Sequence, residues 1–121
     1  MPIKNILVVD DSPTDRQHLS DILAKSGYVV TIAASAEEAL VKIKQLRPDL
    51  VLMDVVMPGQ SGYQATRTLS KDSSTKDIPV IMCTTKGQET DRIWGMRQGA
   101  RDYIVKPVNQ AELLAKISAL G

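Results

Sequence analysis

The stretch Ile6-Leu7-Val8-Val9-Asp10-Asp11 (ILVVDD) runs four aliphatic residues directly into two acids. An unbroken aliphatic run of this length is typical of a strand that is covered on both faces of a parallel sheet. Ser12 and Pro13 follow at once and predict a helix start, with Ser12 as the N-cap, Pro13 at the first helical position and Asp15 at the third. The stretch therefore predicts the beginning of an α/β domain.

The same order of strand and helix recurs along the rest of the chain. Five strands that alternate with five helices predict a doubly wound parallel sheet with helices on both faces, because crossover connections are right-handed. We expect the flavodoxin-like strand order 2-1-3-4-5 in one domain spanning residues 1–121. The expected strands are residues 3–9, 28–33, 50–53, 79–83 and 103–105, and the expected helices are 12–26, 35–47, 62–69, 89–98 and 109–120.

Composition excludes several classes of function. The 121 residues carry a formal net charge of +1 and no run of like charge, which gives no drive toward nucleic acid or an anionic membrane surface. The N-terminal MPIKN lacks an apolar signal core, and no apolar segment approaches membrane-spanning length. The single cysteine, Cys83, lies in an apolar run and can form no internal disulfide. We therefore expect a cytoplasmic protein with a buried thiol.

Four of the expected strands end on residues with reactive side chains. Asp10 and Asp11 follow the first strand, Asp54 the third, Thr84 the fourth and Lys106 the fifth. The carboxyl ends of parallel strands meet at one edge of the sheet, where ligands bind in such folds. A single aspartate at such a place is more often a helix cap or turn residue, but the joint pattern favours a site.

Three carboxylates at one edge repel one another and need a cation, either Lys106 or a magnesium ion. Mg²⁺ prefers oxygen ligands, which Asp11, Asp54 and the backbone carbonyl of Val56 could supply. A carboxylate is also a competent nucleophile toward a phosphoryl group. The ammonium of Lys106, loop N–H groups and the Thr84 hydroxyl would then hold the phosphoryl oxygens.

The whole chain resembles the receiver domain of two-component response regulators. The residues that carry the resemblance are Asp10, Asp11, Asp54, Met57, Pro58, Gly59, Thr84, Tyr103, Lys106 and Pro107. It implies that Asp54 accepts a phosphoryl group from a histidine kinase, and that Asp10 and Asp11 hold Mg²⁺. It also implies that the protein catalyses only its own phosphorylation and dephosphorylation.

The resemblance further implies how such a domain switches. Thr84 would be the switch hydroxyl, Lys106 would contact the phosphoryl group, and the Tyr103 side chain would turn inward when Thr84 moves. The Lys106-Pro107 peptide bond would be cis, which an X-Pro bond adopts at small cost.

Residues 84–108 (TTKGQETDRIWGMRQGARDYIVKPV) resemble, more narrowly, stand-alone receivers of the pilus chemosensory system that controls twitching motility, of the PilH type. This resemblance implies a chemotaxis-type histidine kinase and a downstream protein target. No output domain is expected after Gly121, so the signal would pass through a partner.

The fourth helix is expected to carry part of that partner surface. Helical spacing predicts a buried side made of Ile93, Met96 and Ala100. The same spacing predicts an outward stripe, and an exposed tryptophan beside arginines is typical of an interaction site. The expected partner surface is Trp94, Arg97, Arg101 and Tyr103, with Thr90 on the same stripe.

Other functions remain open at this point. An aspartyl-phosphate hydrolase needs a second acid two residues after the nucleophile, where this chain has Val56. A nucleotide- or flavin-binding module needs a glycine-rich loop after the first strand, where this chain has Asp10-Asp11-Ser12-Pro13. A phosphate sink for a sister regulator and a degenerate receiver that binds partners without phosphorylation are the remaining alternatives.

Overall fold

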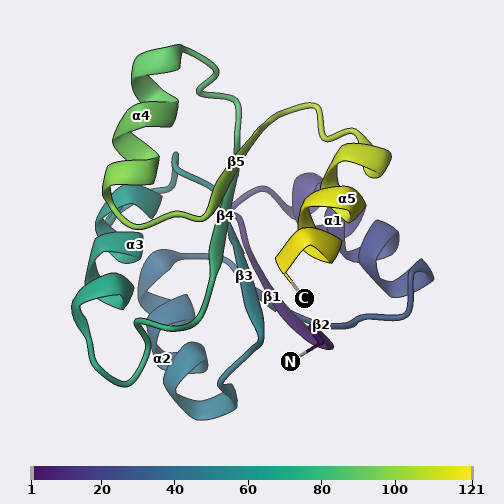
Figure 1. Cartoon of the computed structure of the whole chain (residues 1–121), viewed down its shortest axis with the longest axis horizontal. Coiled ribbons are helices and arrows are strands. Elements are labelled where there is room, and N and C mark those ends of the chain that lie inside the picture. The colour runs from purple at the N-terminus through teal and green to yellow at the C-terminus, as the bar shows by residue number, and fades with distance from the viewer. Residues whose placement is uncertain (1, 121) are drawn as a thin grey trace.

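The structure, a computed structural model, describes residues 2–120, within which five parallel strands alternate with five helices (Figure 1). The strand order β2-β1-β3-β4-β5 confirms the predicted doubly wound, flavodoxin-like sheet. Within these residues no helix has the length and apolar character needed to cross a membrane. The elements are β1 (Asn5–Val9), α1 (Pro13–Lys25), β2 (Val29–Ala33), α2 (Ala36–Leu46), β3 (Leu50–Met53), α3 (Gly62–Lys71), β4 (Val80–Thr84), α4 (Glu89–Arg97), β5 (Asp102–Val105) and α5 (Gln110–Leu120).

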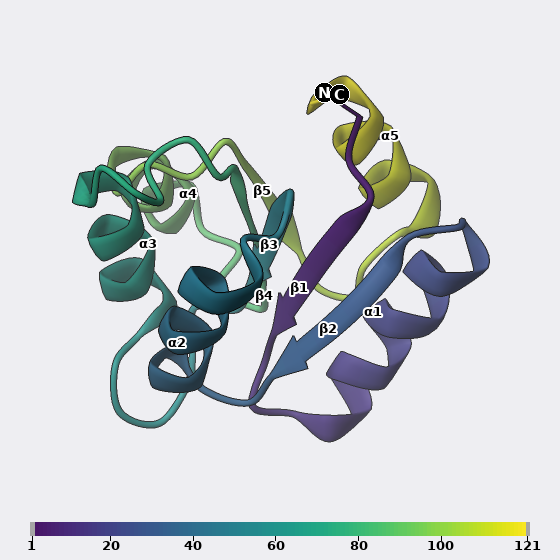
Figure 2. The ribbon, with the colours of Figure 1, turned by 90° about the horizontal axis from the view of Figure 1, so that it is seen from below.

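Helices α1 and α5 cover one face of the sheet, and α2, α3 and α4 cover the other (Figures 1 and 2). Successive side chains of a strand point to opposite faces. In β1, Ile6 and Val8 accordingly join the core that contains residues of α1 and α5, while Leu7 and Val9 join the core that contains residues of α2 and α3. Burial on both faces explains why the inner strands β1, β3 and β4 are almost continuously apolar rather than alternating.

Cys83 lies in the core on the α1 and α5 side, as predicted. Burial raises the pKa of its thiol to about 12, so the side chain stays protonated and packs as a small apolar group.

The predicted buried side of α4 is wrong in two of its three residues. Ala100 is buried, but Ile93 and Met96 are 46% and 39% exposed. The helix instead turns Gly95 toward the sheet, so closely that a Cβ atom there would lie 2.8 Å from Met82 Sδ and 3.1 Å from Tyr103 Cε2. Hydrophobic periodicity cannot detect a contact made by a residue without a side chain, and Ile93 and Met96 therefore remain on the outer surface.

Candidate functional site

The predicted site residues converge at the carboxyl edge of the sheet. Asp10 follows β1, Asp54 follows β3, Thr84 ends β4, and all three are buried. Asp11 is exposed, so the cluster opens to solvent on that side. Asp10, Asp11 and Asp54 each offer a carboxylate oxygen, and these oxygens lie within 4.8 Å of one another.

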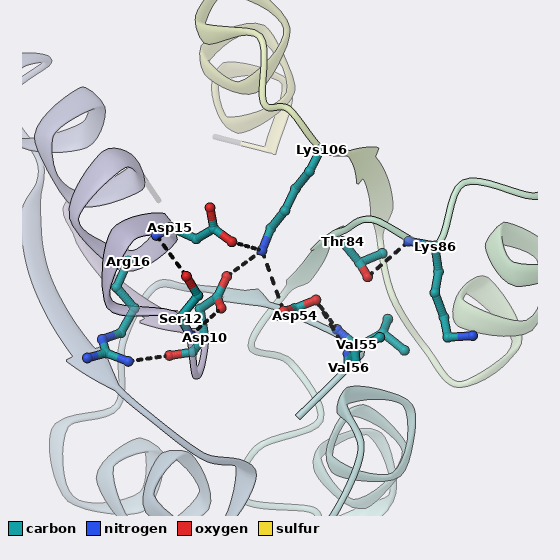
Figure 3. A network of polar contacts seen from close by, with 10 residues as sticks. All are labelled: Asp10, Ser12, Asp15, Arg16, Asp54, Val55, Val56, Thr84, Lys86 and Lys106. Carbon is teal, nitrogen blue, oxygen red and sulfur yellow. Dashed lines mark hydrogen bonds and ion pairs between the residues drawn. The ribbon is translucent and has the colours of Figure 1, made fainter. Parts of the chain in front are cut away.

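Lys106, directly after β5, extends its ammonium group into this cluster (Figure 3). Its Nζ lies 2.6 Å from Asp10 Oδ2, 2.9 Å from Asp15 Oδ2 and 3.5 Å from Asp54 Oδ2. Burial by itself would lower the pKa of Lys106, but the hydrogen bonds to Asp10 and Asp15 and the charge of Asp54 raise it overall. The lysine is therefore a permanent cation at every physiological pH.

Asp54 has two carboxylate oxygens in different surroundings. Its Oδ1 accepts the backbone N–H of Val55 at 2.7 Å and that of Val56 at 3.4 Å, while Oδ2 faces Lys106 (Figure 3). Burial raises the pKa of Asp54; Lys106 opposes this effect and the charge of Asp10 adds to it. The negative charge of ionised Asp54 is thus only partly balanced by nearby positive charge. A further cation at the site, or protonation of the carboxylate, would lower the free energy of the folded protein.

We expect Asp54→Asn to raise the free energy of unfolding of the metal-free protein at neutral pH, because the amide removes a buried and poorly compensated negative charge. Because the folded-state pKa of Asp54 is raised, ionisation destabilises the fold as pH rises through that value. The gain should therefore shrink as pH falls toward about 4, the ordinary value. Urea unfolding in EDTA at both pH values measures it; an asparagine variant less stable at neutral pH would contradict this reading.

The loop after β1 is held in place by its own polar groups. Asp10 Oδ1 accepts the N–H of Ser12 at 2.9 Å, and Arg16 Nη1 donates to the backbone oxygen of Asp10 at 2.7 Å (Figure 3). Ser12 caps α1 and Pro13 starts it, as predicted. Asp15 and Arg16 were not anticipated as members of the site. The signal that could have found them is their place in the first turn of the helix that leaves the acidic strand end.

A chain of hydrogen bonds connects Thr84 with Tyr103. The N–H of Lys86 donates to Thr84 Oγ1 at 3.3 Å, and the Tyr103 hydroxyl donates to the backbone oxygen of Lys86 at 2.7 Å. The peptide units around Lys86 thus link the hydroxyl at the site to the aromatic ring beneath α4. The Lys106-Pro107 peptide bond is cis, as the resemblance implies.

Tyr103 is only 5% exposed, so in this structure it does not contribute to an outer partner surface as expected. Burial, together with Tyr63, raises the pKa of its hydroxyl, which therefore remains a donor. The other three residues of the expected partner surface, Trp94, Arg97 and Arg101, are exposed.

The donor set fits a hard divalent cation. Mg²⁺ selects carboxylate and carbonyl oxygens and retains several waters. Asp10, Asp11 and Asp54 offer such oxygens on the side where Asp11 meets solvent. The ligand role of the Val56 carbonyl stays a prediction.

The amino-acid sequence of this chain is similar to a known protein family and to several characterised proteins. Residues 6–118 match the family described as the response regulator receiver domain. The chain is 53% identical to protein PilH of Pseudomonas aeruginosa over 115 residues, with 95% of each chain covered. It is 39% identical to the phosphate regulon transcriptional regulatory protein PhoB of Escherichia coli, covering 97% of this chain and 51% of PhoB, about half of that relative's length.

Several solved structures share the fold of this chain. A putative response regulator from Chloroflexus aurantiacus superposes with a TM-score of 0.93 at 36% identity, covering 99% of this chain and 98% of the other. The chemotaxis protein CheY4 of Vibrio cholerae gives a TM-score of 0.91 at 34% identity, covering 98% and 99%. The CheX-CheY-BeF3-Mg²⁺ complex of Borrelia burgdorferi gives a TM-score of 0.90 at 30% identity, covering 97% and 88%.

Proposed function

This chain belongs to the response regulator receiver family, and from that premise we propose that Asp54 is the carboxylate that accepts its phosphoryl group. One observation carries the assignment. Asp54 Oδ1 accepts the backbone N–H groups of Val55 and Val56, whereas its Oδ2 lies at a long 3.5 Å from Lys106 Nζ. In Asp10, by contrast, Ser12 occupies one oxygen and Lys106 the other at 2.6 Å. Asp54 is therefore oriented and has an oxygen with room to react.

In the proposed transfer, Asp54 Oδ2 forms a bond to the phosphorus of a phosphohistidine on a histidine kinase. The phosphorus–nitrogen bond breaks, its electron pair stays on the imidazole nitrogen, and an acyl phosphate forms on Asp54. Lys106 and the N–H groups of Val55 and Val56 stand where they can stabilise the phosphoryl oxygens. The domain acts only on its own acyl phosphate and turns over no external substrate.

The residues proposed to hold Mg²⁺ are Asp10, Asp11, Asp54 and the backbone carbonyl of Val56. When bound, the ion would neutralise carboxylate charge and the charge that develops on the transferred group. Thr84 would donate its hydroxyl hydrogen to a phosphoryl oxygen, and its oxygen could still accept the N–H of Lys86.

The proposed biological setting follows the PilH relative: a cytoplasmic receiver in residues 1–121, phosphorylated by a chemotaxis-type kinase and controlling pilus-driven twitching motility. The surface proposed to bind the downstream protein is the outer side of α4 with Trp94, Arg97 and Arg101. Ile93 and Met96 enlarge it with apolar area that the sequence pattern had placed in the core. A role as phosphate sink would use the same Asp54 chemistry.

The proposal is tested with beryllofluoride, a mimic of the phosphoryl group, titrated in the presence of Mg²⁺. Trp94 fluorescence reports the response of α4, and amide NMR reports binding itself. The wild-type protein should bind with Mg²⁺ and not in EDTA, while Asp54→Asn should lose binding by at least about 100-fold, the scale of a lost charged ligand contact.

Asp77→Asn is the matched control, because Asp77 is an exposed aspartate in the turn before the amino end of β4, whereas the site lies at the carboxyl ends of the strands. It should bind as the wild type does. Retained Mg²⁺-dependent binding in Asp54→Asn, or no binding to the wild type, would overturn the proposal. The latter result would favour the degenerate receiver.

A further inference from the structure

Helix α1 begins with a capping sequence whose acid does not cap. In the pattern Ser12-x-x-Asp15, the side chain of the third helical residue commonly returns to the N–H of the N-cap residue. Here Ser12 Oγ accepts the N–H of Asp15 at 3.3 Å, but the N–H of Ser12 goes to Asp10 Oδ1 at 2.9 Å. The Asp15 carboxylate turns the other way and accepts from Lys106 Nζ at 2.9 Å (Figure 3).

Because of this contact, three aspartates share the ammonium group of Lys106. An ammonium group has three N–H donors. Asp10, Asp15 and Asp54 each accept from it, at 2.6, 2.9 and 3.5 Å respectively. Asp15 is thus closer to the ammonium than Asp54 is, although Asp15 is not among the three acids whose oxygens gather as a cation site. The Asp15 carboxylate is joined to the site through its bond to Lys106.

The three acids differ in how easily they release the lysine. The side chains of Asp10 and Asp54 are 1% and 8% exposed, whereas that of Asp15 is 44% exposed. Water can replace Lys106 at Asp15 at little cost, but not at the buried Asp10. When a phosphoryl group enters beside Asp54, the ammonium can therefore move toward it only by loosening its bond to Asp15.

We propose that Asp15 is a positioning residue that holds Lys106 back from Asp54 and thereby weakens the affinity of the site for a phosphoryl group. The inference rests on the proposed function of Asp54 as acceptor. It assigns to Asp15 the role of a competing partner, so that its removal makes the phosphorylated-like state easier to reach.

The test measures beryllofluoride affinity by amide NMR at saturating Mg²⁺ in Asp15→Asn and Asp15→Glu. Asp15→Asn should bind about fivefold more tightly, the scale of one partly exposed ion pair. Asp15→Glu keeps the charge and should restore the wild-type affinity. The proposed function of Asp54 is checked separately, by the loss of binding in Asp54→Asn relative to the wild type. The roles proposed for Asp54 and for Asp15 are therefore contradicted by different results.

Two controls separate positioning from the removal of a negative charge. Asp21→Asn neutralises another exposed acid of α1, one that accepts from Gln17, and should leave the affinity unchanged. In a Lys106→Ala background, Asp15→Asn should have no further effect. The proposal is overturned if Asp15→Asn binds no more tightly, if Asp21→Asn gives the same gain, or if the gain persists without Lys106. If the Lys106→Ala protein binds too weakly to titrate, failure of Asp15→Glu to restore affinity overturns it instead.

Discussion

Gly62→Ala is expected to lower the free energy of unfolding by about 3 kcal/mol, at the upper end of the cost of overpacking. Gly62 is the first residue of α3, and its N–H donates to the backbone oxygen of Val55 at 3.0 Å. A Cβ atom at this position would lie only 2.0 Å from the backbone oxygen of Asp54 and 2.9 Å from Val55 Cα. The obstructing atoms are backbone, so no side chain can rotate to make room.

The relief of this clash must displace either the start of α3 or the peptide unit of Asp54. The second displacement would move the proposed acceptor relative to Lys106, so we also expect beryllofluoride to bind more weakly. Urea unfolding measures the change in stability, and a beryllofluoride titration in the presence of Mg²⁺ measures the change in affinity.

Gly27→Ala is the control for this variant. Gly27 has a positive φ of 93° but no heavy atom within 4 Å of a built Cβ. Alanine there costs only backbone strain of about 1–2 kcal/mol, far from the site. Should Gly62→Ala prove no more destabilising than Gly27→Ala, the close approach of α3 to Asp54 would not be the constraint that we infer.

The sequence predicted the fold well because its strongest signals are local. The run Ile6–Val9, the Ser12-Pro13 helix start and the regular alternation of strands with helices each have a physical cause within a few residues. The topology then follows from the right-handed crossover rule, and it brings Asp10, Asp54, Thr84 and Lys106 to one edge. Most of the candidate site was therefore predictable.

What the sequence did not reveal depends on contacts between distant segments. The role of Gly95 arises from Met82 and Tyr103 on two strands, and no helical pattern marks a glycine as the buried face. Asp15 satisfied a capping pattern, and only the position of Lys106, 91 residues later, shows that its carboxylate turns elsewhere. The Asp15 carboxylate could either cap the N–H of Ser12 or pair with Lys106, and in this structure it pairs with Lys106.

Lys106→Ala is expected to leave Mg²⁺-dependent beryllofluoride binding measurable but to abolish the accompanying change in Trp94 fluorescence. Binding survives because Asp54 and the N–H groups of Val55 and Val56 remain. A ligand shifts a two-state equilibrium only by its difference in affinity for the two states, and a nearly complete shift needs about 5.5 kcal/mol. Without the Lys106 ammonium group, the affinities of bound beryllofluoride for the two states become much more similar.

The route by which the response would reach Trp94 is visible in the structure. Thr84 Oγ1 is bonded to the N–H of Lys86, the oxygen of Lys86 accepts from Tyr103, and the Tyr103 ring lies against Gly95, next to Trp94. Trp94 is 49% exposed, so a small displacement of α4 would alter the solvent contact of its indole ring.

The same variant should also lose about 3 kcal/mol of stability in EDTA, because it leaves the buried Asp10 without its partner. Mg²⁺ should restore much of this loss, since the cation would take over the compensation of charge. Lys86→Ala is the matched control: it removes an exposed lysine side chain from the same edge but keeps the backbone groups that bond Thr84 and Tyr103. It should retain the fluorescence change. An unaltered Trp94 response in Lys106→Ala would show that the hydroxyl of Thr84 and the metal site together suffice, and that the lysine serves stability alone.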